Sequence, residues 1–396
     1  MNPEHSTHAH EVGAVVIGGD FQGLGIVRSL GHHQVPVGLI DNEASIARFS
    51  RYASFAERVS AFGDAARTVE ILLDLARKRD LQGWVLYPTR DETVAAISEF
   101  KTELEKVYRV PTACWNTIKN IWDKRNTYDL AERLGIPAPR THRIRDKKDL
   151  DHLDVIFPVA IKPAIKEHFV YETSVKAWRA NNRAELKEFF DRASQFMPVE
   201  ELLIQDLIPG DGSNQYSYCA FFKQGQAISK LVACRRRQHP IEFGKSSTYV
   251  ESIELPLLEE YSERFLRAID YYGLVELEYK YDTRDGQYYL LDVNGRTWGY
   301  HTIGRRAGVD FPYLLFLDQL NKPVEQSRGR SGIRWIRLVT DLPVGLLGIL
   351  QGKLHTGAYL RSLREFDEEA VFSRDDPIPG LVEIALIPYL AIKRGF

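Results

Sequence analysis

The segment from Tyr288 to Gly299 constrains the fold and the chemistry of this chain more than any other. An apolar run leads directly into an acid, an amide and a guanidinium set two residues apart, namely Asp292, Asn294 and Arg296. Alternate residues of a β-strand share one face, so these three side chains point the same way. Carboxylate and amide oxygens suit Mg²⁺, and an arginine fork suits a phosphate or a carboxylate. The strand therefore predicts a site for phosphoryl chemistry.

The preceding segment, residues 274–281, predicts a partner strand in a β-hairpin, because a turn-rich loop connects the two. Glu276 and Glu278 are two residues apart on this strand and share one face. A carboxylate that lies across the hairpin from Asp292 and Asn294 would complete a set of oxygen ligands. We predict that Glu278 is the third metal ligand.

Composition places the chain among ordinary globular proteins. It has 396 residues, 44% of them hydrophobic, and a formal net charge of −2. This length accommodates two or three domains, and the near-neutral charge disfavours nucleic acid as a partner. Three widely spaced cysteines suit a reducing compartment, so we expect a cytoplasmic protein. The apolar runs are shorter than the ~20 residues that cross a bilayer, so we expect no transmembrane segment.

Strand-like and helix-like segments alternate at the start of the chain and predict a βαβ unit with a parallel sheet. A second unit begins with a helix that Gly135 is placed to end, and it mixes strands and helices. The fold class is therefore α/β followed by α+β. The predicted divisions are a flexible tail at 1–11, a βαβ domain at 12–116, a second domain at 117–320 with a smaller lobe at about 140–208, and a C-terminal extension of unread role at 321–396.

The glycine-rich turn Gly18–Gly25 lies between a strand and a helix, where backbone N–H groups can hold an anion. Asp41 ends the next strand, at the position of the ribose-binding acid in dinucleotide-binding folds. However, Asp20 replaces the second glycine of Gly-x-Gly-x-x-Gly. Three interpretations stay open: a tight turn for close packing, which is favoured, a substrate-binding turn, and an NAD site.

Isolated cations lie upstream of the Asp-x-Asn-x-Arg strand. Lys162 ends an apolar strand, Lys124 lies in a helix beside buried elements, and Lys176 lies in the segment Ser174-Val-Lys-Ala. Taken singly, each is typical of a surface lysine. A triphosphate needs several fixed positive groups, so together they predict phosphate contacts. Arg237, in a run of three arginines, is our candidate for gripping an acyl phosphate or a substrate carboxylate.

The segment Gln205–Gly210 ends a strand and turns sharply at its Pro-Gly pair. An adenine ring binds to such an edge through backbone groups, with Leu207 or Ile208 as the apolar face. A plain β-turn is the simpler interpretation of this motif on its own.

In this order along the chain, the two lysines, the hinge and the Glu278 hairpin resemble the ATP-grasp superfamily. The resemblance is to its carboxylate–amine ligase branch, in which D-aspartate ligases are the nearest group, and it covers about residues 12–320. It implies a Rossmann-like pre-ATP-grasp domain followed by two lobes that hold ATP between them.

The resemblance also implies roles for the site residues. Lys124 and Lys162 would contact phosphates, and Arg296 would steady the transferred phosphoryl group and the oxyanion formed later. Lys176 stays a third phosphate candidate on its residues alone. The hinge residues Gln205, Asp206, Leu207 and Ile208 would meet adenine or ribose, and Glu278, Asp292 and Asn294 would hold one or two Mg²⁺ ions, or Mn²⁺ in their place. The chain departs from the family in having Asp292 and Gly295 where Glu and Pro are frequent, and in a glycine-poor loop at 164–174.

The function that this resemblance implies is ATP-dependent ligation of a small carboxylic acid. ATP would convert the acid to an acyl phosphate, and an amine, or a thiol, would then displace the phosphate. Small-molecule acid and amine substrates are the expected partners. The oligomeric state stays open, with a homodimer as one candidate because dimers are common among relatives. Two alternatives stay open: an ATP-binding regulatory protein without turnover, and an NAD-dependent oxidoreductase built on the first βαβ unit.

Overall fold

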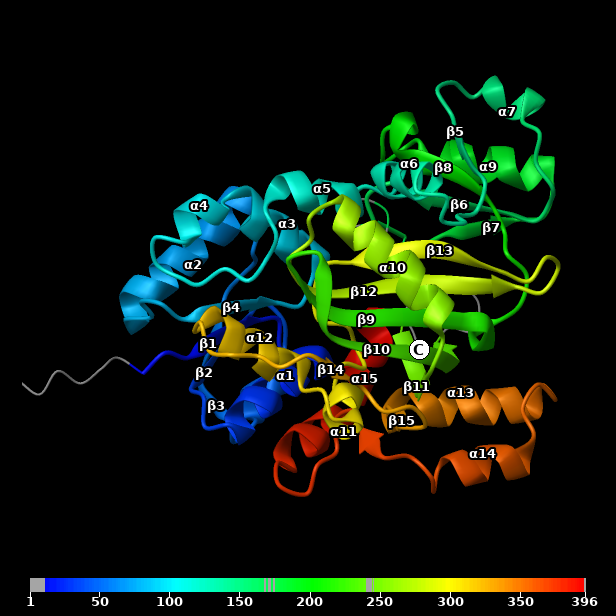
Figure 1. Cartoon of the computed structure of the whole chain (residues 1–396). Coiled ribbons are helices and arrows are strands. Elements are labelled where there is room, and N and C mark those ends of the chain that lie inside the picture. The colour runs from blue at the N-terminus through cyan, green and yellow to red at the C-terminus, as the bar shows by residue number, and fades with distance from the viewer. Residues whose placement is uncertain are drawn as a thin grey trace, which may run out of the picture.

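The computed structural model describes the backbone of residues 11–166, 169, 172–173, 175–239, 244 and 246–394, and the side chains of these residues as far as residue 388. The strands of this part of the chain form three β-sheets with helices around them (Figure 1). The predicted tail lies outside the described residues except for Glu11, and so does part of the 164–174 loop.

The first sheet is parallel, with the strand order β3-β2-β1-β4. Its inner strands are buried on both faces, as expected where helices cover a parallel sheet. This confirms the parallel sheet that the sequence predicts. The elements of this domain are β1 (Ala14–Ile17), α1 (Phe21–His32), β2 (Val37–Asp41), η1 (Ala47–Phe49), β3 (Ala53–Arg58), α2 (Ala65–Arg79), β4 (Val85–Pro88), α3 (Asp91–Glu99) and α4 (Lys101–Leu104).

A small antiparallel sheet follows, with the order β5-β8-β6-β7. Helix α9 packs on it through Leu186 and Phe190. Gly135 has φ +63° just beyond α6, so it ends that helix as the sequence predicts. The elements are α5 (Trp115–Trp122), α6 (Lys124–Arg133), β5 (Thr141–Arg143), α7 (Asp149–His152), β6 (Val159–Pro163), β7 (Trp178–Ala180), α9 (Arg183–Ala193), η2 (Val199–Glu201) and β8 (Leu202–Asp206).

The largest sheet has the order β13-β12-β9-β10-β11-β15-β16, and β14 also pairs with β10. Helix α10 covers one face through Leu258 and Phe265. Phe221 and Leu231 of the sheet share a core with Leu24 of α1, so this sheet packs against the parallel-sheet domain. The elements are η3 (Gly212–Asn214), β9 (Gln215–Lys223), β10 (Gln226–His239), β11 (Ser246–Ile253), α10 (Pro256–Ala268), β12 (Gly273–Asp282), β13 (Gln287–Asn294), α11 (Ile303–Ala307), α12 (Phe311–Gln319) and β14 (Ser327–Arg328).

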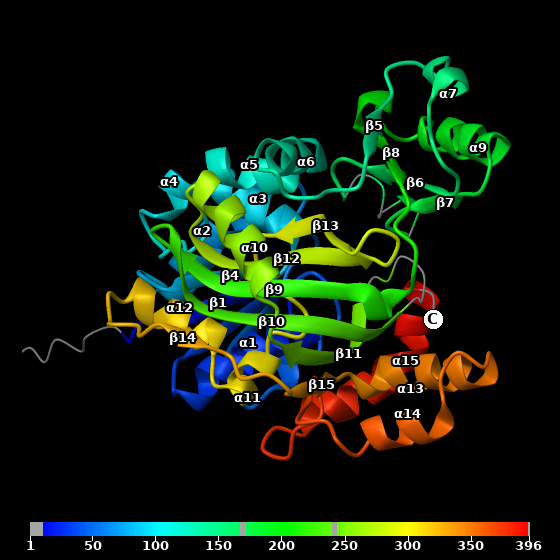
Figure 2. The same ribbon diagram turned by 45° about the vertical axis from the view of Figure 1, so that its right-hand side comes forward.

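The C-terminal extension adds two short strands to the edge of the largest sheet and three helices beneath it (Figure 2). Asp376 anchors it to α1 by accepting a 2.9 Å hydrogen bond from Arg28 Nε. None of the described helices is long and apolar enough to cross a membrane. The elements are β15 (Arg334–Ile336), α13 (Leu338–Leu350), α14 (Thr356–Ser362), β16 (Glu368–Glu369) and α15 (Ile378–Arg394).

Candidate active site

The hairpin β12–β13 brings the predicted metal ligands together. Its register pairs Glu278 with Asp292 and Glu276 with Asn294. The amide Nδ2 of Asn294 donates to Glu278 Oε1 at 2.9 Å and to Glu276 Oε2 at 3.1 Å. The cross-strand contact that the sequence predicts is therefore present, and it involves both glutamates.

The pKa values of the two glutamates shift in opposite directions because their partners differ. Burial opposes ionisation of Glu278, but the charges of Arg235 and Lys176 outweigh burial and lower its pKa to about 2. Burial and the neighbouring Glu278 raise the pKa of Glu276, whose Oε1 accepts a 2.6 Å hydrogen bond from the Tyr300 hydroxyl. Glu278 is thus ionised at neutral pH, and Glu276 holds the Asn294 amide from the other side.

Oxygen ligands for a divalent cation are available here in a suitable chemical form. Glu278 and Asp292 are carboxylates that line a cavity, and Asn294 adds an amide. Among the described residues, no group of three or more His, Cys, Asp or Glu side chains is arranged as a metal site. Two carboxylates and one amide, with water and phosphate oxygens, fit Mg²⁺ better than a metal that needs a full cage of protein ligands.

Lys124 and Lys162 approach this strand from different elements. Lys124, the first residue of α6, places Nζ 2.5 Å from Asp292 Oδ1, and this carboxylate raises the pKa of the lysine although burial opposes it. Lys162, near the end of β6, donates to the Tyr128 hydroxyl at 2.5 Å. Both lysines therefore point into the space between the small sheet and the large one.

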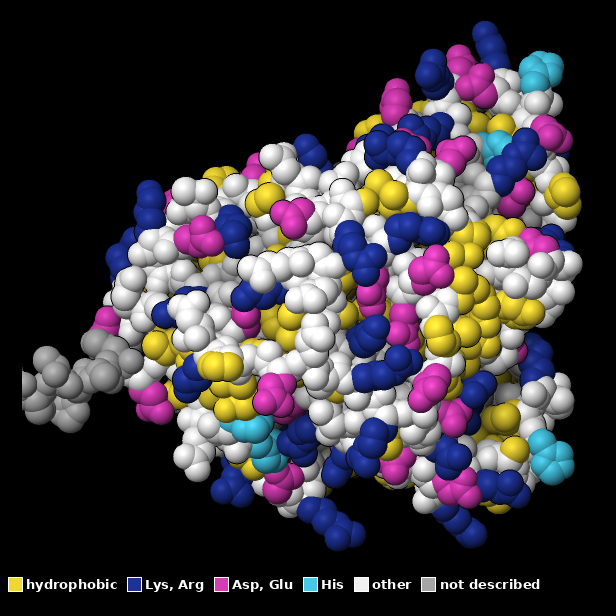
Figure 3. Space-filling model, viewed as in Figure 1, with side chains coloured by type: hydrophobic (Ala, Val, Ile, Leu, Met, Phe, Trp, Pro, Cys, Tyr) yellow, Lys and Arg dark blue, Asp and Glu magenta, His cyan; other side chains and the backbone are white. Residues whose placement is uncertain are grey.

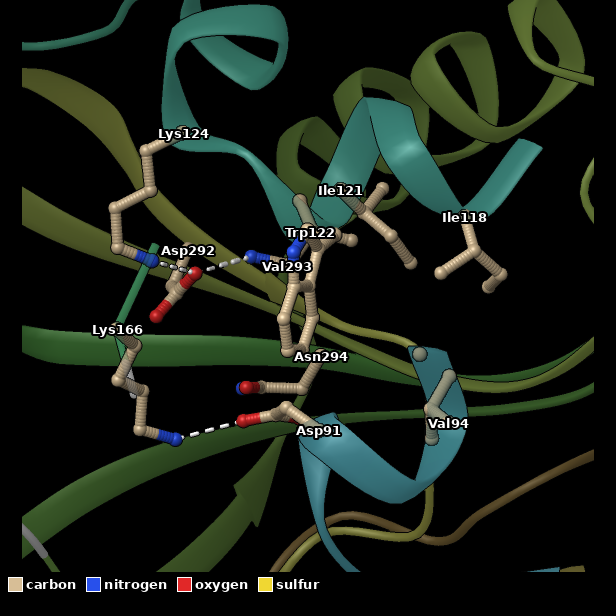
Figure 4. A pocket seen from close by; sticks show the side chains of 11 residues that line it. Asp91, Val94, Ile118, Ile121, Trp122, Lys124, Lys166, Asp292, Val293 and Asn294 are labelled. Carbon is tan, nitrogen blue, oxygen red and sulfur yellow. Dashed lines mark hydrogen bonds and ion pairs between the residues drawn. The ribbon is translucent and has the colours of Figure 1, made fainter. Parts of the chain in front are cut away.

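Arg296 connects the hairpin to the parallel-sheet domain, and its Nη2 donates to Asn294 Oδ1 at 3.3 Å. Its Nε donates to Asp91 Oδ1 at 2.5 Å, and its Nη2 donates to Asp91 Oδ2 at 3.2 Å. Lys166 Nζ donates to the same carboxylate at 2.7 Å (Figure 4). Burial raises the pKa of Asp91, but the charges of Arg296 and Lys166 outweigh it and hold the pKa well below its ordinary value.

The structure does not bring Arg237 to this group. A β-bulge at Arg236 separates Arg235 from Arg237, so these two side chains lie on opposite faces of β10. Arg235 Nη2 donates to Glu278 Oε2 at 3.2 Å, whereas Arg237 makes two 2.8 Å hydrogen bonds to Asp341 of α13. Arg235 takes the place in the site that the sequence suggests for Arg237.

A cavity of about 820 Å³ lies between the small sheet and the large sheet. This volume suits a nucleotide-sized ligand. Most of the predicted site residues line it, and Asn294 lines a smaller adjoining pocket. The predicted residues on the wall of the large cavity are Lys124, Lys162, Lys176, Gln205, Asp206, Leu207, Ile208, Glu278 and Asp292.

The hinge after β8 forms one end of this cavity. Gln205 is buried and its Nε2 donates to Thr141 Oγ1 at 2.7 Å, so its side chain holds the small sheet together. Ile208 is buried at the cavity wall, and Gly210 turns the chain with φ +92°. The hinge therefore offers a ring-shaped ligand an apolar surface and backbone groups.

The glycine turn before α1 serves packing. Asp41 accepts a 2.7 Å hydrogen bond from the Gly19 backbone N and a 3.1 Å bond from Arg90 Nη2. Gln22 Nε2 donates to the Thr89 backbone oxygen at 2.9 Å. Because Asp41 already accepts from the protein's own groups, these contacts favour the structural interpretation over an NAD site.

Three residues of the site were not recognised in the sequence. Asp91 looks there like an ordinary helix start, and Lys166 lies in the glycine-poor loop. Arg235 differs from Arg237 only through a bulge, which leaves no sequence signal. Contacts between domains decide the first two, so a local pattern cannot reveal them.

Comparison with known proteins agrees with this geometry. No model of a protein family matches the chain. It is 24% identical over 354 residues to D-aspartate ligase from Enterococcus faecium (strain Aus0004), covering 83% of this chain and 82% of that protein. The structure resembles L-amino acid ligase from Bacillus licheniformis, with a TM-score of 0.62 and 16% identity over 79% of this chain and 75% of that one.

A second solved structure, N5-carboxyaminoimidazole synthetase from Staphylococcus aureus complexed with ADP, matches with a TM-score of 0.62 and 14% identity over 80% of each chain. The chain has the ATP-grasp fold. The mixed α/β class with a parallel first sheet is therefore confirmed, and the chain is similar in sequence to D-aspartate ligase over most of its length. The Rossmann-like character of the first domain stays a prediction.

Proposed function

We propose that the chain is an ATP-dependent ligase that joins a small carboxylic acid to an amine. The observation that carries the proposal is the cavity of about 820 Å³, which brings three lysines and two ionisable ligands of one hairpin together. The relatives support it, since they are named as ligases or synthetases that join small molecules.

The reaction has two chemical steps, a phosphoryl transfer and an acyl transfer. A carboxylate oxygen of the acid attacks the γ-phosphorus of ATP, the bond from that phosphorus to the bridging oxygen breaks, and ADP leaves. The amine nitrogen then attacks the acyl carbon, and the bond from this carbon to the phosphate oxygen breaks. The ammonium loses two protons, one to the departing phosphate and one to solvent. The products are an amide, ADP and phosphate.

The chain's own residues hold the reacting groups in place. We assign Lys124, Lys162 and Lys176 to the phosphates, because several fixed cations offset the charge of a triphosphate. The hinge at Leu207 and Ile208 receives the adenine. Mg²⁺ bound with the nucleotide would neutralise charge on the moving phosphoryl group.

The hairpin supplies the proposed metal ligands, and two arginines act beside them. Glu278, Asp292 and Asn294 would hold the metal. Arg235, which keeps Glu278 ionised, takes the role that the sequence suggests for Arg237, and Arg296 remains the arginine for the transferred phosphoryl group. No side-chain nucleophile is required.

D-Aspartate is the first acid to test, because the D-aspartate ligase from Enterococcus faecium is similar to most of this chain. The test measures ADP release with Mg·ATP over panels of amino acids and amines. We expect release that depends on one acid, and an amide product by mass spectrometry. A folded protein that binds no Mg·ATP would sink the proposal.

The variant Asp292→Asn separates a ligase from a regulatory ATP-binding protein. It removes one charge from the proposed metal site, so we expect acid-dependent ADP release to fall roughly 100-fold or more. Asp285→Asn makes the same change at the exposed tip of the hairpin and should leave turnover intact. A wild-type protein that binds ATP but shows no turnover with any acid would favour the regulatory alternative.

We also propose that the protein is cytoplasmic and forms a homodimer. All three cysteines are free, in agreement with a reducing compartment. The exposed apolar residues Leu346 and Leu350 of α13 offer a surface for a second copy. Lys, Arg, Asp and Glu side chains are interspersed over the face shown in Figure 3, without one continuous basic field for nucleic acid. Sedimentation velocity tests the dimer.

A further inference from the structure

Asp91 reaches the reaction centre from a domain other than the one that carries the metal ligands. It is the first residue of α3, and its two oxygens accept from Arg296 and Lys166. It faces Asn294 of β13 across a small pocket (Figure 4).

The acids near the reaction centre have different duties. Those that line the two adjoining cavities among the described residues are Asp91, Asp206, Asp211, Glu278 and Asp292. Two of them lie at the hinge end, and Glu278 and Asp292 belong to the proposed metal set. Asp91 is the remaining carboxylate, and it lies at the end of the large cavity where Lys124 and Asp292 meet the small pocket.

The pocket beside Asp91 has a volume of about 30 Å³ and apolar walls that include Val94, Ile121 and Trp122. One water-sized group needs about 10–15 Å³ of such volume, so the pocket holds a single polar head with little else. It shares Lys124, Lys166 and Asp292 with the large cavity, so the rest of a substrate can extend there.

We propose that Asp91 docks the ammonium group of the amine substrate. This rests on the proposed ligase function and extends it to the second substrate. An ammonium that enters a site lined by Lys124, Lys166 and Arg296 meets like charges, so it needs a carboxylate to bind. Arg296 and Lys166 are also the cations that a phosphoryl group attracts. Binding of the substrate anions draws these two cations from Asp91 and leaves its carboxylate for the ammonium.

The test compares two nucleophiles in the variant Asp91→Asn. One is the amine substrate found in the ADP-release screen, which enters as an ammonium. The other is hydroxylamine, which is uncharged near neutral pH and traps an acyl phosphate as a hydroxamate. Losing a charged hydrogen bond should lower kcat/KM for the amine roughly 10- to 100-fold, with hydroxamate formation reduced less than about threefold. Asp91→Glu should restore part of the amine reaction.

A matched control lies on the same helix. Glu99→Gln changes an exposed carboxylate of α3 to an amide and should alter neither reaction. If Asp91→Asn lowers both reactions equally, Asp91 acts only by holding Arg296, and the docking role is overturned. If the wild-type protein forms neither amide nor hydroxamate with any acid, the ligase function fails, and the docking role fails with it.

Discussion

At the residue scale, Lys176 connects the site to pH. Burial, together with the charges of Lys166 and Arg235, lowers the pKa of this lysine to about 8, although Glu278 opposes the shift. A bound triphosphate favours the charged form. Above pH 8 the free protein must therefore take up a proton on binding. We expect the Kd for Mg·ATP to be level below pH 8 and to rise above it, by at most about tenfold per pH unit. Calorimetric titration from pH 7 to 9.5 measures this.

Two variants show whether Lys176 is the group responsible. Lys176→Arg keeps its charge and should flatten the pH dependence, whereas the exposed control Lys322→Met should follow the wild type. A slope that persists in Lys176→Arg would assign the titration to another group. The stability of the free protein changes in the opposite sense. Between pH 8 and the ordinary lysine value the unfolded chain binds more protons, so the free energy of unfolding rises with pH in that window.

The sequence could predict those site residues whose positions follow from one strand or one turn. Asp292, Asn294 and Glu278 fall into this class, because a period of two and a hairpin turn define their face and their partners. Arg235 does not, because the bulge at Arg236 reverses the facing of β10. A single inserted residue therefore decides which arginine enters the cavity.

At the element scale, the turn before α1 shows why its glycines are needed. A Cβ on Gly23 would lie 2.0 Å from the backbone oxygen of Gly18, and backbone cannot move aside as a flexible side chain can. Gly23→Ala should therefore destabilise the protein by about 1–3 kcal/mol. Urea unfolding measures the loss.

Gly357→Ala is the matched control for this change. It lies on exposed α14, where a Cβ would be 3.4 Å from the His355 ring, so it should be neutral or slightly stabilising. Full stability in Gly23→Ala would show that the turn relaxes. An anion-binding role for the turn would then deserve a direct binding test.

Element length also explains which parts of the fold a sequence pattern can indicate. Strand β13 and helix α2 are long enough to show a period, and β1 is a short, continuous apolar run. Strands β15 and β16 have three and two residues, too few for any pattern. The sequence therefore indicates no role for the C-terminal extension, although these strands continue the largest sheet.

At the scale of the whole molecule, the site depends on contacts between separate units. Asp91 comes from the parallel-sheet domain, Lys162 from the small sheet and Asp292 from the large sheet. Gln351 and Lys353, just beyond α13, line the same large cavity. Such contacts join residues that are far apart in the chain, so the pattern of one sequence read on its own cannot indicate them.

The ion pair between Arg237 and Asp341 joins the C-terminal extension to the largest sheet. The Asp341 side chain is fully buried, and the Arg237 guanidinium also lies 4.2 Å from the centre of the Tyr249 ring. Arg237→Met leaves a buried carboxylate without its cation, so stability should fall by about 3 kcal/mol. The folded protein should keep acid-dependent ADP release, and Arg236→Met is the exposed control. Unchanged stability with lost turnover would instead return Arg237 to the reaction, as the sequence suggests.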